Sequence, residues 1–187
     1  LTGKYPARAG VGRLIGGRRG ISGLSPSQVT LASMLKPLGY QTAMFGKWHL
    51  GLAEESSPNA HGFDRFFGFK TGCIDYYSHI YYSGQAIGVN PHHDLWENTS
   101  EVWENGRYMT HLITDKSVEF IQKQGEAEDP FFLYIAYNAP HFPLHAPQEY
   151  RDRFAPLPWD RRVMAAMIAA VDDGVGRIVD ALKQAGV

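Results

Sequence analysis

The sequence predicts an α/β fold, in which a mixed and mostly parallel sheet is flanked by helices. Short apolar runs typical of strands alternate with segments of helical periodicity. The longest run, residues 131–137 (FFLYIAY), is continuous, which is typical of a strand buried on both faces. The chain also contains 20 glycines and 11 prolines, and we therefore expect many turns and long loops.

The first third of the chain predicts one short helix and one strand after a Gly- and Arg-rich loop over residues 1–24. Residues 25–28 (SPSQ) favour a helix start, because Ser25 and Gln28 are spaced as a capping box and Pro26 suits the first helical position. Pro37 is expected to end or bend this helix. A strand should follow over residues 40–45, stopped by Gly46.

The rest of the chain predicts one short strand, two longer helices and the apolar strand already described. Residues 51–109 are the least regular part, with a strand around residues 63–69, and a helix is expected over residues 110–124. A last helix is expected over residues 160–185, capped by Asp160. Its predicted core stripe consists of Met164, Met167, Ile168, Val171, Val175, Ile178 and Leu182.

Length and composition are those of a single domain. The chain has 187 residues, of which 44% are hydrophobic and 20% charged. No apolar run approaches the length of a membrane span, and the single cysteine, Cys73, excludes an internal disulfide. The chain begins with Leu1 and ends just after a helix stop, so both ends are expected to be cut from a longer protein.

Charge is unevenly distributed, although the net charge is only −1. Residues 1–53 contain no acidic residue and seven basic ones, which are Lys4, Arg8, Arg13, Arg18, Arg19, Lys36 and Lys47. This distribution favours the handling of an anion, although a solvated basic face is the simpler interpretation. Nucleic acid is not the expected partner, because no nucleic-acid-binding motif is present.

The sharpest motif is residues 46–51 (GKWHLG), directly after the predicted first strand. In extended backbone, residues two apart point the same way, so Lys47 and His49 would present an ammonium and an imidazole together. The carboxyl edge of an open α/β sheet is where such folds bind ligands. A fixed cation beside a titratable ring suits an anionic ester, but a strand-end turn with two exposed side chains would give the same pattern.

Two nucleotide-binding motifs are excluded. Six residues separate Gly39 from Gly46 where a phosphate-binding P-loop requires four, and Trp48 replaces the needed serine or threonine. Residues 10–12 (GVG) lack the third glycine of a dinucleotide fingerprint, because Ile15 stands there.

A second candidate lies in residues 138–147 (NAPHFPLHAP), directly after the apolar strand. Prolines on both sides of His141 would stiffen the backbone and restrict its ring. His141 and His145 are four residues apart, but the run is too rich in proline for a helix and no complementary cysteine or carboxylate lies nearby, so zinc binding is disfavoured. A loop histidine that only packs or hydrogen-bonds remains the alternative.

Together these motifs resemble the sulfatase family. The opening residues 1–6 (LTGKYP) resemble the segment just after the family's Cys/Ser-x-Pro-Ser-Arg signature, and residues 39–51 resemble its second signature. Residues 131–150 are similar to the loop that carries another active-site histidine, most like bacterial arylsulfatases. Residues 171–177 (VDDGVGR) resemble the helix before the family's later metal-binding strand.

The resemblance implies a partial alkaline-phosphatase-like sandwich and the hydrolysis of a sulfate ester. In that family a cysteine or serine is converted to formylglycine, which attacks sulfur, and Ca²⁺ anchors the sulfate oxygens. Carried over by motif, Lys47 would bind sulfate, His49 would contact the formylglycine hydroxyl as a base, and His141 would contact sulfate or the leaving oxygen. His145 lies off the family position.

The resemblance also implies what should lie elsewhere. Residues 1–187 would be the middle part of the catalytic domain, with the formylglycine segment upstream and the later metal-binding strand downstream, so no metal ligand is assigned here. Cys73 lacks the proline and arginine that the maturating enzyme reads. The 187-residue chain alone is therefore expected to be inactive.

The partners implied are a sulfated small molecule or sulfated glycan, and a formylglycine-generating or anaerobic sulfatase-maturating enzyme for the longer parent. A bacterial periplasmic or secreted location is implied as well. Two alternatives stay open: a phosphate or phosphonate ester hydrolase of the same superfamily, and a short non-catalytic protein that binds sulfated glycans through its basic third.

Overall fold

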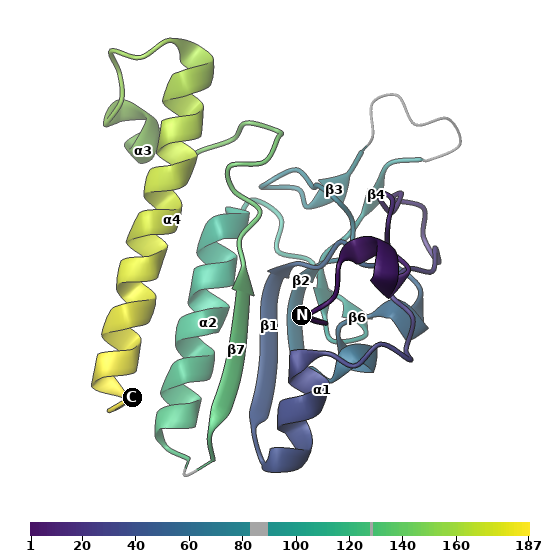
Figure 1. Ribbon diagram of the computed structural model, residues 1–187. Helices are drawn as coiled ribbons and strands as arrows, with labels where there is room; N and C mark the ends of the chain where they lie inside the picture. Colours follow the sequence, from purple (N-terminus) through teal and green to yellow (C-terminus); the bar gives the residue numbers. More distant parts are fainter. Residues whose placement is uncertain (83–89, 128) are drawn as a thin grey trace.

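The computed structural model describes residues 1–82, 90–127 and 129–187 (Figure 1). Its α-helices are α1 (Leu31–Leu35), α2 (Met109–Gly125), α3 (Gln148–Asp152) and α4 (Trp159–Gln184). Its strands are β1 (Gln41–Lys47), β2 (Arg65–Phe69), β3 (Ile80–Tyr81), β4 (His92–His93), β5 (Trp96–Glu97), β6 (Ser100–Glu101) and β7 (Phe131–Ala136). Short 3₁₀ helices are η1 (Pro6–Ala9), η2 (Lys36–Leu38), η3 (Glu54–Ser56) and η4 (Asn59–His61).

Five strands form one mixed sheet in the order β6-β5-β2-β1-β7. The long pairings are parallel, since β1 runs parallel to both β2 and β7, while the short β5 and β6 add antiparallel edges. Helices α2 and α4 pack against each other along one face of the sheet (Figure 1). The predicted α/β class, with a mostly parallel sheet flanked by helices, is confirmed.

The first helix begins later than predicted. Residues 25–28 form a turn, and α1 starts at Leu31 after the cap residue Thr30. The Thr30 side-chain oxygen accepts a hydrogen bond from Ser33 N at 3.1 Å, and Ser33 Oγ accepts one from Thr30 N at 2.9 Å. This reciprocal capping box satisfies two amides at once, which explains why the helix starts here.

Gly46 does not stop the first strand, contrary to the prediction. β1 continues to Lys47, and Gly46 is paired with both Gly68 in β2 and Ala136 in β7. Gly46 has a φ of +117°, and a Cβ there would lie 2.0 Å from the Ala136 carbonyl oxygen. Glycine is therefore needed because the neighbouring strand passes too close for a side chain.

Strand β7 is not buried on both faces as predicted. Phe131, Leu133 and Ile135 pack toward the helices, but all three are only half-buried, and Tyr134 on the other face is 37% exposed. The reason is position: among the described residues β7 lies at the edge of the sheet and pairs only with β1. The continuous apolar run of β7 is therefore only partly buried on the face toward the helices, and Tyr134 on the other face is exposed.

Helix α4 was predicted at nearly the right place but with the wrong buried face. It begins at Trp159 after Pro158, so Asp160 is not its cap. Of the predicted stripe only Met167 and Ile178 are buried. The buried face is made mostly of small residues, namely Val163, Ala166, Met167, Ala170, Gly174, Ile178 and Ala181.

Close packing explains this choice of face. A Cβ on Gly174 would lie 2.6 Å from the Thr114 side-chain oxygen on α2, so the two helices approach where side chains are small. The larger members of the predicted stripe point outward instead, and Met164 and Ile168 are 44% and 51% exposed. The face of α4 that packs against α2 is therefore the one with small side chains, which allows the close approach.

A buried histidine makes the fold sensitive to acid. His79 is fully buried; its Nε2 lies 3.2 Å from the Arg107 carbonyl oxygen, and its ring faces that of His93 at 6.3 Å. Burial lowers the pKa of His79 from 6.5 to about 4. Between these two pH values the unfolded chain binds a proton that the folded chain excludes, so stability is full above about pH 6.5 and falls as the pH drops.

We predict that the free energy of unfolding falls by up to about 3 kcal/mol through His79 alone as the pH drops from 6.5 toward 4. The substitution His79→Asn should weaken this dependence, because asparagine tolerates the positive φ of 57° and does not titrate. Chemical denaturation at several pH values measures the effect. An unchanged pH slope in His79→Asn would show that His79 is not the titrating group.

Candidate active site

Lys47 ends β1 at the carboxyl edge of the parallel strands. Its backbone is paired with Phe69 of β2, and the following Trp48 N donates a hydrogen bond to Phe69 O at 2.9 Å. Burial lowers the pKa of Lys47, and the neighbouring Cys73 thiol partly offsets this. Within residues 1–82, 90–127 and 129–187 no carboxylate forms a salt bridge with Lys47, so its ammonium is available to an anion.

Trp48 anchors the segment between the two candidate side chains. Its indole is buried, and Nε1 donates a hydrogen bond to Ser56 O at 2.7 Å. The ring also packs edge-on against Phe63, with centroids 6.4 Å apart. The side chain is thus held in the core below the sheet edge, and this fixes the backbone on which Lys47 and His49 stand.

His49 has a left-handed backbone conformation and not an extended one. The strand ends at Lys47, and His49 has a φ of 55°, so the predicted two-residue alternation does not reach it. Its Nε2 lies 3.2 Å from Ile15 O. Since a carbonyl can only accept, Nε2 carries the proton and Nδ1 keeps a free lone pair. The ring also lies against Gly72, where a Cβ would be 2.8 Å from Nε2.

The pKa of His49 depends on both of the other predicted residues, Lys47 and His141. The pKa of His49 is lowered first by burial and then by the positive charge of Lys47, while the hydrogen bond to Ile15 raises it and His141 lowers it slightly further. The ring is therefore neutral near pH 7 and can accept a proton. The parallel pairing of β1 with β7 places the segments that carry Lys47, His49 and His141 at the same edge of the sheet.

His141 lies in the loop after β7 and is half-buried. Its backbone N donates to Asn138 O at 2.8 Å, and its Nδ1 lies 2.9 Å from Phe142 O. Because that carbonyl accepts, Nδ1 is the protonated nitrogen and Nε2 is left for a ligand. His145 of the same loop turns elsewhere, with Nδ1 3.3 Å from an Asp75 oxygen.

Cys73 lies near Lys47, and the sequence analysis did not predict this proximity. Burial raises the pKa of its thiol, and the charge of Lys47 offsets this only in part, so the thiol stays protonated near pH 7. Its Sγ lies 4.0 Å from Tyr82 O. A protonated, half-buried thiol is a poor nucleophile. The one feature of the sequence that could have predicted its place near Lys47 is that Cys73 closely follows the end of β2.

Part of the basic first third has a structural role. Arg19 forms an ion pair with Glu101 at 2.8 Å and donates to the His93 carbonyl, and Lys36 pairs with Asp64. These charges tie the N-terminal third to later segments of the chain.

The described residues do not fit a metal ion. Across residues 1–82, 90–127 and 129–187, no three His, Cys, Asp or Glu side chains come together in a way that could hold one. The chemistry that these residues offer is therefore that of a cation, a neutral imidazole and a second imidazole.

The three candidate side chains thus follow the carboxyl ends of paired parallel strands in an α/β fold. The Sulfatase family model matches residues 1–187, which is the whole chain. Mouse arylsulfatase J is 37% identical over 190 residues, which is 100% of this chain and 31% of that relative. The chain belongs to the Sulfatase family.

Other relatives agree with this assignment. The uncharacterized sulfatase YdeN of Escherichia coli (strain K12) is 30% identical over 211 residues, covering 100% of this chain and 35% of that protein. The crystal structure of Ps i-CgsB in complex with k-i-k-neocarrahexaose is 33% identical with a TM-score of 0.88, covering 100% of this chain and 43% of that one. The chain spans about a third of the length of these two curated relatives.

Members of the family generally depend on Ca²⁺ and formylglycine. As for membranes, none of the helices in the described residues is both long and apolar enough for a span.

Proposed function

We propose that the protein carrying this chain hydrolyses a sulfate ester. The observation that supports the proposal is that Lys47 and His49 lie at the carboxyl end of β1 and His141 follows the paired strand β7, in a chain that the Sulfatase family model matches throughout. A half-buried cation beside a neutral imidazole can bind a sulfate group and move a proton on it.

Each side chain has a separate role in this proposal. The Lys47 ammonium holds a sulfate oxygen, and its partial burial strengthens that contact because water competes less. His49 takes a proton through Nδ1, the nitrogen that Ile15 leaves free. His141 contacts the sulfate or the leaving oxygen through Nε2, the nitrogen that does not face the Phe142 carbonyl.

Residues 1–187 form the middle part of a longer catalytic domain in this proposal. A formylglycine nucleophile, produced by a formylglycine-generating or anaerobic sulfatase-maturating enzyme, would be supplied by another segment. The ligands of Ca²⁺ would also come from elsewhere, since the described residues gather no metal-binding group. We place the protein outside the cytoplasm, in the periplasm or secreted.

The substrate class that we propose is a sulfated glycan or a small aryl sulfate. Two observations support it: a structural neighbour with a TM-score of 0.88 was solved with k-i-k-neocarrahexaose, and mouse N-acetylgalactosamine-6-sulfatase is 29% identical over the whole chain. Both names concern a sugar, whereas the name of arylsulfatase J, 37% identical, concerns an aryl ester, so both substrate classes belong to the proposal.

The test is the release of inorganic sulfate by the complete protein, co-expressed with a maturating enzyme. An aryl sulfate, a sulfated carrageenan oligosaccharide and an aryl phosphate are compared, and the released anion is measured by ion chromatography. Release of sulfate from at least one sulfate ester, with little phosphate, is expected. Faster release of phosphate would move the protein to the related phosphate-ester hydrolases.

A further inference from the structure

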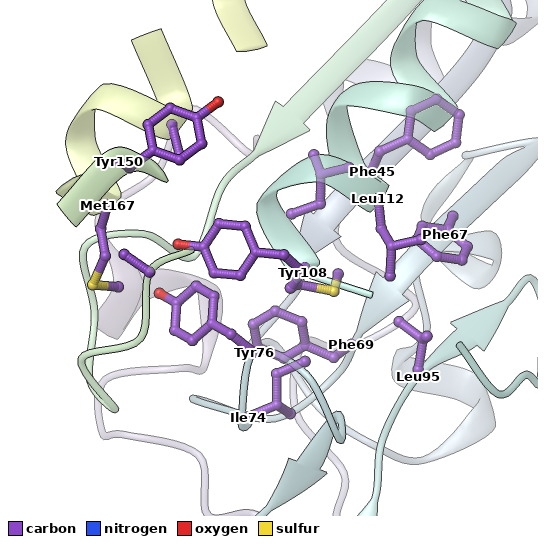
Figure 2. Packing of buried hydrophobic residues seen from close by; sticks show 14 of the residues in the cluster. Phe45, Phe67, Phe69, Ile74, Tyr76, Leu95, Tyr108, Leu112, Tyr150 and Met167 are labelled. Atoms are coloured by element: carbon purple, nitrogen blue, oxygen red, sulfur yellow. The ribbon is translucent and has the colours of Figure 1, made fainter. Parts of the chain in front are cut away.

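Two buried tyrosines hold the backbone of the loop that carries His141 and His145. The Tyr76 hydroxyl donates a hydrogen bond to His141 O at 2.9 Å, and the Tyr108 hydroxyl donates one to His145 O at the same distance. Figure 2 shows both rings side by side, with their hydroxyls directed toward the same side of the cluster. Each tyrosine thus fixes the main chain of one histidine.

The two contacts are closely matched. Tyr76 and Tyr108 are 0% and 4% exposed, and their rings stack with centroids 5.4 Å apart. Burial raises the pKa of both hydroxyls, so both stay protonated and donate at any physiological pH. Breaking either hydrogen bond costs free energy, because the carbonyl oxygen of the histidine would lose its partner.

The two histidines differ in what their side chains face. His141 follows β7, whose Ala136 pairs with Gly46 next to Lys47, and it lowers the pKa of His49, so it lies with the candidate active site. His145 lies beside Asp75, whose other oxygen accepts hydrogen bonds from Tyr77 N and Ser78 N. Tyr76 therefore supports the histidine of the site, while Tyr108 supports its neighbour outside it.

We propose that Tyr76 is a positioning residue that acts through His141. Its hydroxyl holds the His141 carbonyl, and this restricts the direction in which the imidazole can point. The ring of Tyr76 is anchored in the core by Tyr108, so the restriction is rigid. The inference rests on the proposed function, in which His141 contacts the sulfate or the leaving oxygen.

The test compares Tyr76→Phe with Tyr108→Phe in the complete protein. Each substitution removes one hydroxyl from an equally buried ring and one hydrogen bond from the same loop. We expect similar losses of thermal stability in both, but a fall in kcat of about 10-fold, with KM changed less than about 3-fold, only in Tyr76→Phe. Equal kcat in the two variants would overturn the proposal.

A double-mutant cycle with His141→Ala separates this inference from the proposed function. If Tyr76 acts through His141, adding Tyr76→Phe to His141→Ala should lower kcat no further. Fully additive losses would overturn the positioning role while leaving His141 in the site. Wild-type kcat in His141→Ala alone would instead remove His141 from the proposed mechanism and the positioning role with it.

Discussion

The His49→Ala variant of the complete protein is expected to lose at least ~100-fold in kcat on a sulfate ester, because a positioned general base contributes about 10²–10⁴-fold. The lost group is the Nδ1 lone pair, which the hydrogen bond from Nε2 to Ile15 O leaves free. Steady-state kinetics on a single substrate measure the loss. A kcat within a few fold of wild type would remove His49 from the mechanism.

The pH profile of the wild-type enzyme gives a second view of the same group. Burial and the charge of Lys47 lower the pKa of His49 below its ordinary 6.5. A base must be unprotonated to act, so the acid limb of kcat/KM is expected below pH 6.5. The substitution Lys47→Ala removes one of the charges that lower this pKa, and the limb should then move to higher pH.

Two controls separate catalysis from folding. His49→Asn suits the φ of 55°, but its shorter amide does not reach Ile15 O and cannot accept a proton as imidazole does. It should therefore be as inactive as alanine but more stable. His61 is a buried histidine whose ring nitrogens lie near two backbone carbonyls, so His61→Asn should lower stability and leave kcat within a few fold.

Lys47→Ala is expected to lower kcat/KM by at least ~100-fold, since removing one stabilising group from a developing charge costs about 10²–10³-fold. The Lys47 ammonium is partly desolvated and forms no salt bridge with a carboxylate in the described part of the chain. Its positive charge would therefore attract a bound sulfate strongly. Steady-state kinetics with sulfate as a competitive inhibitor should also show weaker inhibition. Unchanged inhibition by sulfate would contradict the role of Lys47 as the anion-binding group.

Lys70 offers a matched control for this substitution. It directly follows β2 as Lys47 ends β1, it is 5% exposed, and burial lowers its pKa too. Its ammonium lies 4.0 Å from the centroid of the Trp96 ring and near the Asp94 carboxylate, so these two groups already compensate its positive charge. Lys70→Ala should therefore destabilise the fold while sulfate inhibition stays near the wild-type value.

Periodicity predicted most of the fold, and packing decided what it missed. The alternation of apolar runs with helical segments was enough for the class, for α2 and α4, and for the central strands. The start of α1 was missed because Thr30 and Ser33 form the capping box, five residues after the expected pair Ser25 and Gln28. The buried face of α4 was missed because only the structure shows that α2 approaches at Gly174.

The candidate site shows the same division. Motif spacing singled out Lys47, His49 and His141, because charged and titratable groups stood at the ends of predicted strands. Spacing could not show that His49 would leave extended geometry, or that Gly72 would make room for its ring. Tyr76 lies 65 residues from His141 in the chain, so no local pattern could connect the two.

The most direct measurement is a crystal structure of the complete protein with bound selenate, whose selenium is located by anomalous diffraction. The account predicts one strong peak at the carboxyl edge of β1, with Lys47 Nζ and His141 Nε2 both within hydrogen-bond distance of the anion. A selenate bound elsewhere, with these two nitrogens turned away from each other, would contradict it.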